Sequence, residues 1–280
     1  MRATPNAQVR SLATGDRSPR LRSCAVYDEE LAFAQRVADR ADRIGLELFR
    51  ASGLSVRRKA DRTLVTEADL AIERMVRDEL AAAFPGDRIL GEEEGGSLAT
   101  EGRLWVLDPI DATANFARGV PIWATLLALV EDGETVVGVA SAPALGERYA
   151  AAQAAGATMN GEPIRVSGVA AIGDAHVSIH EPEILLGGPL RQAVERIVVD
   201  CWRPRAFGDF WGHLLVARGA VDATIEPTLN LWDVAALRVI VAEAGGRITT
   251  FDGDVAGHGT SALTTNGLLH DEIRQRLTAS

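Results

Sequence analysis

Apolar side chains recur at helical spacing in two segments near the start of the chain. Residues 28–51 form the first segment, which predicts an amphipathic helix closed by Gly53. Residues 67–84 form the second, and the turn-forming sequence Pro85-Gly86-Asp87 stops this predicted helix. Residues 55–63 between the helices are basic and polar, which favours a loop or a short hairpin.

Short apolar segments then predict a run of strands. Asp132-Gly133 and Asn160-Gly161 are typical of the tight turns that join antiparallel strands. The predicted strands are residues 88–91, 104–107, 123–131 and 135–142. Residues 149–157, followed by Asn160-Gly161, indicate two more strands around a tight turn, and 164–166 follows.

Strand and helix patterns alternate in the second half. The predicted strands are residues 175–179, 202–206, 223–225, 247–250 and 262–265, and the helices are 190–199, 210–217, 234–244 and 271–277. This rhythm predicts the α/β class, more fully a layered α+β arrangement. We expect one catalytic unit from residue 26 to 280, with two packed halves, about 26–166 and 167–280, and the active site between them.

Composition narrows the function. The 280 residues are 47% hydrophobic, enough to bury a sizeable core, and the formal net charge of −10 argues against binding nucleic acid or an anionic membrane. An anionic substrate would need added positive charge, which metal cations held by carboxylates could supply. Two distant cysteines, Cys24 and Cys201, argue against a zinc site and fit a cytoplasmic protein. No apolar run is long enough to span a membrane.

The first residues are different in character. Residues 1–23 carry five arginines and one aspartate and have no apolar stretch typical of a secretory signal. We therefore expect residues 1–25 to be a disordered tail, or the product of a start codon assigned too early. An organellar targeting segment is the alternative.

Acidic residues cluster where three predicted elements meet loops. Glu92-Glu93 follows one strand, Asp108-Pro109-Ile110-Asp111 follows the next, and Asp233 precedes a helix. Ligand sites in α/β folds gather at strand ends. Magnesium prefers carboxylate oxygens and keeps part of its shell for water and phosphate. Asp108 and Asp111 can bend toward one point across the proline-fixed turn, and the Ile110 carbonyl is a plausible further ligand.

Small residues follow this turn. Ala112 and Thr113 can open a helix, whose free N–H groups and positive dipole end favour a phosphate, and Thr113 adds a hydroxyl. Taken singly, an Asp-Pro-x-Asp sequence is more often a turn, and three consecutive glutamates are usually a solvated face.

Taken together, four ordered motifs resemble those of the inositol monophosphatase family. They are Leu64-Val65-Thr66-Glu67-Ala68-Asp69, Gly91-Glu92-Glu93, the signature from Trp105 to Phe116, and Leu231-Trp232-Asp233-Val234-Ala235-Ala236 with Glu243-Ala244-Gly245-Gly246. The resemblance covers about residues 28–280. It implies an αβαβα sandwich of alternating helix and sheet layers and a magnesium-dependent phosphatase acting on a small phosphorylated metabolite. We also expect a homodimer.

The resemblance also implies a role for each site residue. Glu92, Asp108 and the Ile110 carbonyl would hold a first Mg²⁺, and Asp108, Asp111 and Asp233 a second, with Glu92 helping to bind a weaker third ion. Catalysis would use Glu92 together with Asp69 and Thr113, which would orient and deprotonate the attacking water. Ala112 and Thr113 would bind the phosphate. The family usually has glycine where this chain has Ala112, and a positive φ there would distort the phosphate cradle.

Two acidic residues bear on the leaving group. Asp209, in Phe207-Gly208-Asp209-Phe210, and Glu226, seven residues before Asp233, match family positions that contact the organic part of the substrate. Two carboxylates beyond the metals favour a cationic amino alcohol over inositol.

Further segments resemble the actinobacterial-type histidinol-phosphatase branch, which implies L-histidinol phosphate as substrate and a place in histidine biosynthesis. These segments are residues 115–125, 141–145, 207–210 and 265–270. The alternatives are an inositol monophosphatase or another small-metabolite or sugar phosphatase of the same fold, a phosphatase of nucleotide-derived bisphosphates, and a regulatory binding protein without turnover.

Overall fold

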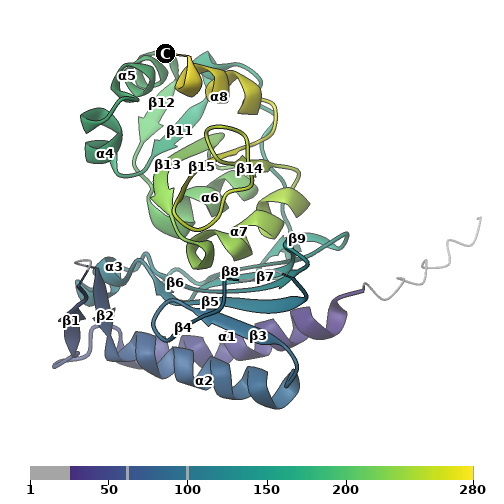
Figure 1. Cartoon of the computed structure of the whole chain (residues 1–280). Coiled ribbons are helices and arrows are strands. Elements are labelled where there is room, and N and C mark those ends of the chain that lie inside the picture. The colour runs from purple at the N-terminus through teal and green to yellow at the C-terminus, as the bar shows by residue number, and fades with distance from the viewer. Residues whose placement is uncertain (1–25, 61–62, 99–100, 280) are drawn as a thin grey trace, which may run out of the picture.

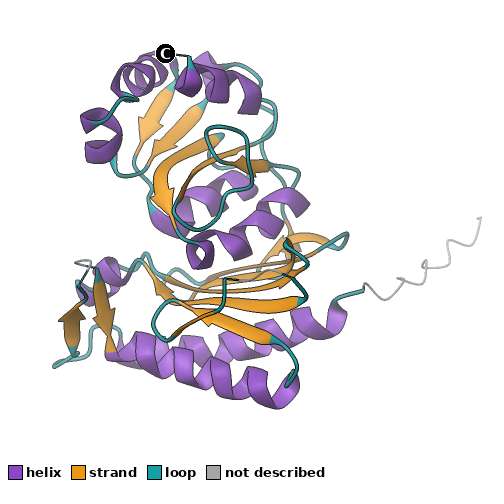
Figure 2. Cartoon of the chain, viewed as in Figure 1, coloured by secondary structure: helices purple, strands orange, loops and turns teal. Residues whose placement is uncertain are grey.

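The protein is a stack of helical and sheet layers. The computed structural model describes residues 26–60, 63–98 and 101–279. The predicted tail 1–25, with Cys24, therefore lies outside the described residues. Figure 1 and Figure 2 show five layers in the order helix, sheet, helix, sheet, helix. This arrangement is the αβαβα sandwich that the resemblance implied.

The described residues form eight α-helices and fifteen strands. The helices are α1 Asp28–Leu48, α2 Glu67–Ala83, α3 Thr113–Ala117, α4 Pro182–Gly187, α5 Arg191–Asp200, α6 Asp209–Ala217, α7 Leu231–Glu243 and α8 His270–Thr278, with a 3₁₀ turn η1 at Ile172–Asp174. The strands of the first half are β1 Val56–Arg58, β2 Leu64–Thr66, β3 Arg88–Gly91, β4 Gly95–Gly96, β5 Arg103–Asp111, β6 Ala124–Glu131, β7 Glu134–Ala142, β8 Glu147–Ala152, β9 Gly156–Met159 and β10 Glu162–Pro163. Those of the second half are β11 His176–Ile179, β12 Arg203–Arg205, β13 Ala223–Leu229, β14 Arg247–Thr249 and β15 Thr260–Thr265.

The larger sheet is mostly antiparallel. Over the described residues its eight strands run in the order β10-β9-β8-β7-β6-β5-β3-β4, and only β3 and β5 pair in parallel. Helices α1 and α2 cover one face, and α6 and α7 cover the other (Figure 1). Both faces of the central strands are therefore buried, which explains why β6 is a nearly continuous apolar run.

The second sheet has the order β12-β11-β13-β15-β14. Helices α4, α5 and α8 pack on its outer face, where Leu185, Ile197 and Ile273 are buried in one apolar cluster. Helix α7 is apolar on nearly all sides because it lies between the two sheets. Its backbone approaches β7 so closely that a Cβ on Gly138 would lie 2.5 Å from the Ala236 carbonyl oxygen.

Most predicted elements are confirmed, and two are wrong. The strand predicted across residues 149–157 is interrupted, because Ala154 at φ 62° and Gly156 at φ 83° turn the chain between β8 and β9. Residues 164–166 form no strand. The N–H of Val166 instead donates to the Ala244 carbonyl at 3.1 Å, and its side chain packs against the layer of α6 and α7.

Two features were not predicted. Helix α4 has no apolar periodicity long enough to detect, since it spans only six residues. Strand β5 continues through the acidic turn to Asp111, four residues beyond the predicted end. Across the described ranges, none of the helices has both the length and the apolar character required to cross a bilayer.

Candidate active site

One cavity gathers the predicted site residues. It has a volume of about 450 Å³ and lies where β5 meets α3, beside the ends of β11 and β13 and the first turns of α6 and α7. The predicted residues that line it are Glu92, Asp108, Ile110, Asp111, Ala112, Thr113, Asp209, Glu226 and Asp233. Asp69 stands behind this lining and reaches it through a hydrogen bond from Thr113.

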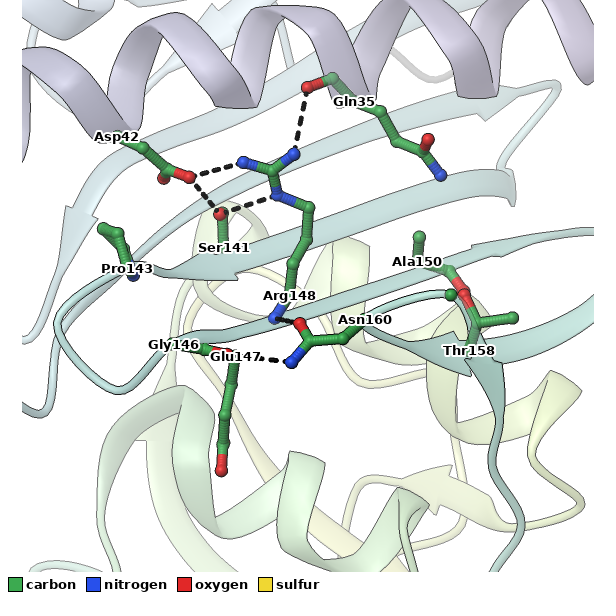
Figure 3. A pocket seen from close by; sticks show the side chains of 11 residues that line it. Gln35, Asp42, Ser141, Pro143, Gly146, Glu147, Arg148, Ala150, Thr158 and Asn160 are labelled. Carbon is green, nitrogen blue, oxygen red and sulfur yellow. Dashed lines mark hydrogen bonds and ion pairs between the residues drawn. The ribbon is translucent and has the colours of Figure 1, made fainter.

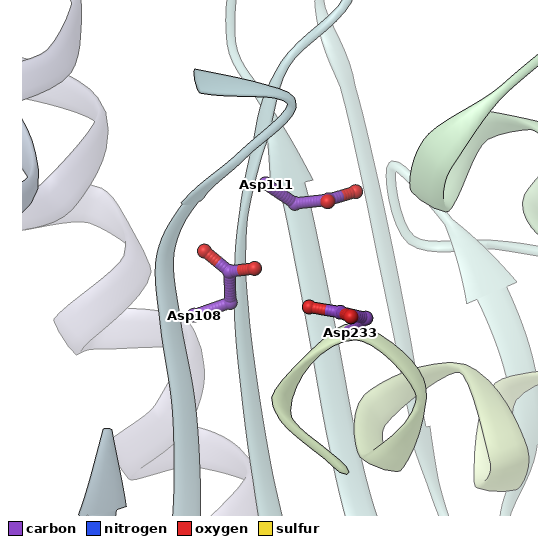
Figure 4. A group of neighbouring side chains, drawn as sticks. All are labelled: Asp108, Asp111 and Asp233. Carbon is purple, nitrogen blue, oxygen red and sulfur yellow. The ribbon is translucent and has the colours of Figure 1, made fainter. Parts of the chain in front are cut away.

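Three carboxylates converge on one side of the cavity. Ligand oxygens of Asp108, Asp111 and Asp233 all lie within 4.8 Å of one another, and Figure 4 shows the side chains turned toward a common point. The pairing of β5 with β6 shifts register between Asp108 and Asp111. This irregularity contains Pro109, and it lets two aspartates three residues apart face the same space.

Helix capping holds Asp69 and Asp233 in place. Asp69 Oδ2 accepts from the Thr66 N–H at 2.8 Å and from Thr66 Oγ1 at 2.5 Å at the start of α2. Asp233 Oδ2 accepts from the Asn230 N–H at 2.6 Å at the start of α7. Each aspartate is the third residue of its helix, where a side chain reaches back to the cap. The capping bond fixes one oxygen of each residue and leaves the other for the site.

Burial and mutual repulsion disfavour the charged form of these groups. The pKa values of Asp108 and Asp111 are raised well above their usual range, first by burial and then by neighbouring carboxylates. Burial likewise raises the pKa of Asp233 to about 7 and that of Asp69 to about 6. Cations placed among these groups would reverse the effect.

The donor set fits a hard divalent cation. Asp108 is buried, and its Oδ1 has no hydrogen-bond partner among the described residues. A buried carboxylate oxygen without a donor is costly unless a cation takes that place. Oxygen-only ligands at this separation suit magnesium or a similar ion.

Glu92 is placed differently from this cluster. It lines the same cavity, but its Oε1 accepts from Lys59 Nζ at 2.7 Å, and the same ammonium lies 2.8 Å from Glu93 Oε1. Glu73 is fully buried and accepts from the backbone N–H groups of Glu93 and Glu94 at 2.9 and 3.0 Å. Glu73 therefore fixes the turn that carries Glu92.

The predicted phosphate side is also assembled. Thr113 Oγ1 lies 3.3 Å from Asp69 Oδ1 and 3.0 Å from the Ile110 carbonyl oxygen. Ala112 precedes α3 at φ 66° and ψ 46°, in the left-handed region. Ala112 therefore has the positive φ that the sequence analysis named as a source of distortion, a conformation that glycine adopts readily and that strains an alanine backbone.

A second part of the cavity lining, here called the leaving-group wall, holds the predicted substrate residues. Glu226 Oε2 lies 2.7 Å from His213 Nε2, and Glu226 Oε1 lies 3.8 Å from His180 Nε2. The Asp209 N–H donates to His180 Nδ1 at 3.0 Å. One bond joins this wall to the acidic cluster, since the Phe210 N–H donates to Asp111 Oδ2 at 2.7 Å.

Sequence reasoning did not identify four of these participants. They are Lys59, Glu73, His180 and His213. The basic character of residues 55–63 was the one available signal, and it pointed to Lys59 only as part of a loop. Their contacts with the other site residues span 13 residues or more in sequence, so the fold alone brings them together.

A second hollow of about 470 Å³ lies between α1 and the strands β7 to β9. Figure 3 shows its centre, where the Arg148 guanidinium turns toward Asp42 and Ser141. Arg148 also lies 2.5 Å from Asp39. No predicted site residue is among the described residues that line it.

Comparison with known proteins agrees with the geometry. The model of the inositol monophosphatase family matches residues 27–279. The chain is 47% identical over 256 residues to the histidinol-phosphatase of Mycobacterium tuberculosis, covering 90% of this chain and 98% of that protein. It is 43% identical over 261 residues to the histidinol-phosphatase of Streptomyces coelicolor, covering 88% and 96%.

A solved structure shares the fold over nearly the whole chain. The IMPase of Thermotoga maritima superposes with a TM-score of 0.81 at 34% sequence identity, covering 90% of this chain and 97% of that one. The family match spans both sheets and every element of the cavity. The chain therefore belongs to the inositol monophosphatase family and is a metal-dependent phosphoric monoester hydrolase.

Proposed function

We propose that this protein hydrolyses L-histidinol phosphate to L-histidinol and phosphate, a step of histidine biosynthesis, with two or three Mg²⁺ ions per site. The main support for this proposal is the acidic character of the leaving-group wall, the part of the cavity lining outside the acidic cluster. Asp209 and Glu226 line it, together with His180. A second set of carboxylates outside the metal cluster favours a leaving group that carries positive charge. Histidinol has an ammonium and an imidazole.

Asp108, Asp111, Asp233, Glu92 and the Ile110 carbonyl would hold the ions. Bound magnesium would supply positive charge to the phosphoryl oxygens and to the departing alkoxide. The Asp108 oxygen without a hydrogen-bond partner supports this assignment. Lys59 occupies a donor position on Glu92, so it would adjust its contacts when a cation binds there.

Asp69 and Thr113 handle the proton of the attacking water in this proposal. The Thr113 hydroxyl can donate to Asp69 or to the Ile110 carbonyl while its lone pairs accept from water. The first N–H groups of α3, which have no acceptor within the helix, face the phosphate from Ala112 and Thr113.

A substrate panel tests the function. With Mg²⁺ present, phosphate release is measured from L-histidinol phosphate, inositol 1-phosphate, fructose 1,6-bisphosphate and p-nitrophenyl phosphate. We expect the highest kcat/KM for histidinol phosphate and no release after chelation. A preference for inositol phosphate would keep the chemistry and reject the substrate.

The inositol monophosphatase alternative is favoured by the likeness to the Thermotoga maritima IMPase. The leaving-group wall, formed by His180, Asp209 and Glu226, disfavours the inositol monophosphatase alternative, because a neutral polyol gains little from facing several carboxylates. A regulatory binding protein would show metal-dependent ligand binding without phosphate release. The expected homodimer and cytoplasmic location stay predictions, and light scattering of the purified protein tests the first.

A further inference from the structure

Glu181 is a third carboxylate on the leaving-group wall. It lies two residues after the end of β11, next to His180 in sequence, and lines the same cavity as Asp209 and Glu226. Its Oε2 is enclosed by the protein and has no hydrogen-bond partner among the described residues. Glu181 therefore lines the cavity while one of its carboxylate oxygens, enclosed by the protein, receives no donor from the described residues.

The backbone of Glu181 takes an uncommon conformation. Glu181 has φ 45° and ψ 58° and precedes Pro182, the first residue of α4. Its carbonyl accepts from the Ile184 and Leu185 N–H groups at 3.0 and 3.3 Å, so the backbone starts the helix. A residue before proline avoids the right-handed helical region, and glutamate is uncommon in the left-handed one.

The same backbone strain marks other parts of this cavity. Seven non-glycine residues in the described ranges have a positive φ, and three of them, Ala112, Glu181 and Asp209, line the cavity. Strain of this kind persists where the surrounding structure fixes it, often at ligand sites. Ala112 belongs to the proposed phosphate site, and Glu181 and Asp209 belong to the leaving-group wall.

Glu226, by contrast, already has partners. His213 Nε2 lies 2.7 Å from its Oε2, and His213 is buried. Because His180 Nδ1 accepts from the Asp209 N–H, the neutral His180 ring carries its proton on Nε2, which faces Glu226 Oε1 at 3.8 Å. His213 therefore bonds one oxygen of Glu226 and His180 lies near the other, whereas Glu181 Oε2 has no partner among the described residues.

We infer that Glu181 is a specificity-determining residue that binds the ammonium group of the leaving amino alcohol. This role rests on the proposed function, because it assumes a cationic leaving group. Asp209, whose N–H bonds the neighbouring His180, would take a second donor of the same substrate. Burial, followed by the carboxylates of Glu226, Glu183 and Asp209, raises the pKa of Glu181, and a cation would favour its charged form.

The test compares Glu181→Gln with Glu183→Gln. Both changes remove one carboxylate from the same short helix region, but Glu183 is exposed and does not line the cavity. For Glu181→Gln we expect kcat/KM for histidinol phosphate to fall about ten- to a hundred-fold, since a charge-assisted bond is lost. Hydrolysis of p-nitrophenyl phosphate, whose leaving group has no ammonium, should change less than twofold. Glu183→Gln should behave as wild type with both substrates.

Binding supplies a second readout. The inhibition constant of L-histidinol, measured against p-nitrophenyl phosphate hydrolysis, should rise by the same factor in Glu181→Gln. Glu181→Asn should repeat the result, because asparagine tolerates the left-handed conformation and keeps the fold. Retained p-nitrophenyl phosphate hydrolysis shows that each variant is folded.

The outcomes separate the inference from the proposed function. If wild type prefers histidinol phosphate and Glu181→Gln keeps that preference and the histidinol affinity, the function stands and the role of Glu181 is wrong. The role is also wrong if both substrates lose equally, because Glu181 then supports the fold or the metal cluster. If wild type shows no preference for histidinol phosphate, the proposed function is wrong, and the role of Glu181, which depends on it, is wrong as well.

Discussion

The two walls of the active-site cavity are built in different ways. The acidic wall takes its side chains from short contiguous motifs: Asp108 and Asp111 share one turn, and Asp69 and Asp233 each belong to a helix-capping arrangement. The leaving-group wall takes His180, Asp209 and Glu226 from the ends of β11 and β13 and the start of α6. The placement of the proposed metal ligands therefore depends on local geometry, whereas the placement of the residues proposed to bind the leaving group depends on contacts between distant parts of the chain.

Their electrostatics differ as well. The carboxylates of the acidic wall repel one another, and Asp108 keeps an oxygen without a donor. On the other wall, His213 and His180 face Glu226. The first wall therefore requires cations to be stable in its charged form, whereas the second is partly balanced by the protein. A change in either wall should affect a different measurement.

The largest effect is expected from Asp108→Asn. The amide removes a buried charge at the centre of the acidic wall, so several kcal/mol of transition-state stabilisation should be lost and kcat should fall about a thousandfold or more for every substrate. Phosphate release from histidinol phosphate and from p-nitrophenyl phosphate measures it. Asp78→Asn, an exposed position on α2, is the control and should leave both rates unchanged. Turnover near the wild-type rate with the same Mg²⁺ dependence would reject the assignment of Asp108.

This wall could be predicted from the sequence because its geometry is local. The proline turn after β5 and the first turns of α2 and α7 each fix an aspartate through contacts within a few residues. The layered fold followed from helical and strand periodicity, which buried faces impose. Lys59 could not be predicted, because its contact with Glu92 spans 33 residues and depends on how the β1–β2 hairpin packs.

A smaller and selective effect is expected from Asp209→Asn. Loss of one charge-assisted bond to the leaving group should lower kcat/KM for histidinol phosphate about ten- to a hundred-fold. Hydrolysis of p-nitrophenyl phosphate should change little, and asparagine suits the left-handed backbone at this position, where φ is 53°. Glu226→Gln should show the same selectivity. Equal losses with both substrates would mean that Asp209 or Glu226 supports the acidic wall, for example through the Phe210 contact with Asp111.

The hydrogen-bond partners on the leaving-group wall could not be predicted from the sequence. Motif spacing identified Asp209 and Glu226, but their surroundings come from pairing of β11 with β13 and of β13 with β15. That pairing brings His213 next to Thr264, 51 residues away, and His180 next to Asp209. The positive φ of Glu181 also leaves no signal in composition or periodicity. Such contacts depend on register between distant strands, which periodicity does not fix.

A third prediction uses the pKa shifts of the acidic wall. Folding raises the pKa of Asp233 to about 7 and that of Asp69 to about 6, whereas an aspartate in the unfolded chain titrates near about 4. Between these values the folded metal-free protein binds more protons than the unfolded chain, so its stability falls as the pH rises from about 4 to 7. Magnesium binds the deprotonated carboxylates and should offset that loss.

Thermal unfolding in EDTA and in MgCl₂ at pH 6 and pH 8 measures this linkage. The rise in Tm caused by Mg²⁺ should be larger at pH 8, by a few degrees, and Asp108→Asn should reduce it. A rise that is larger at pH 6 would contradict the assignment of these groups as ligands. Asp209→Asn should keep most of the wild-type difference, which separates the two walls without any assay of turnover.

The smallest effect is expected from Ala112→Gly, at the proposed phosphate site. Alanine in the left-handed region costs about 1–2 kcal/mol relative to a right-handed residue, while glycine adds about 0.5–1 kcal/mol of unfolded-state entropy. These terms nearly cancel, so Ala112→Gly should change the free energy of unfolding by less than about 1 kcal/mol and keep or raise kcat for both substrates. Chemical denaturation and steady-state rates measure the two quantities. Ala112 packs against the apolar cluster of α1 and α2, which contains no residue of the leaving-group wall. Loss of its methyl group should therefore leave the ratio of the two hydrolysis rates, histidinol phosphate to p-nitrophenyl phosphate, unchanged. A large loss of activity would mean that the loop depends on the alanine side chain, and the placement of Thr113 beside Asp69 would then need to be reconsidered for catalysis.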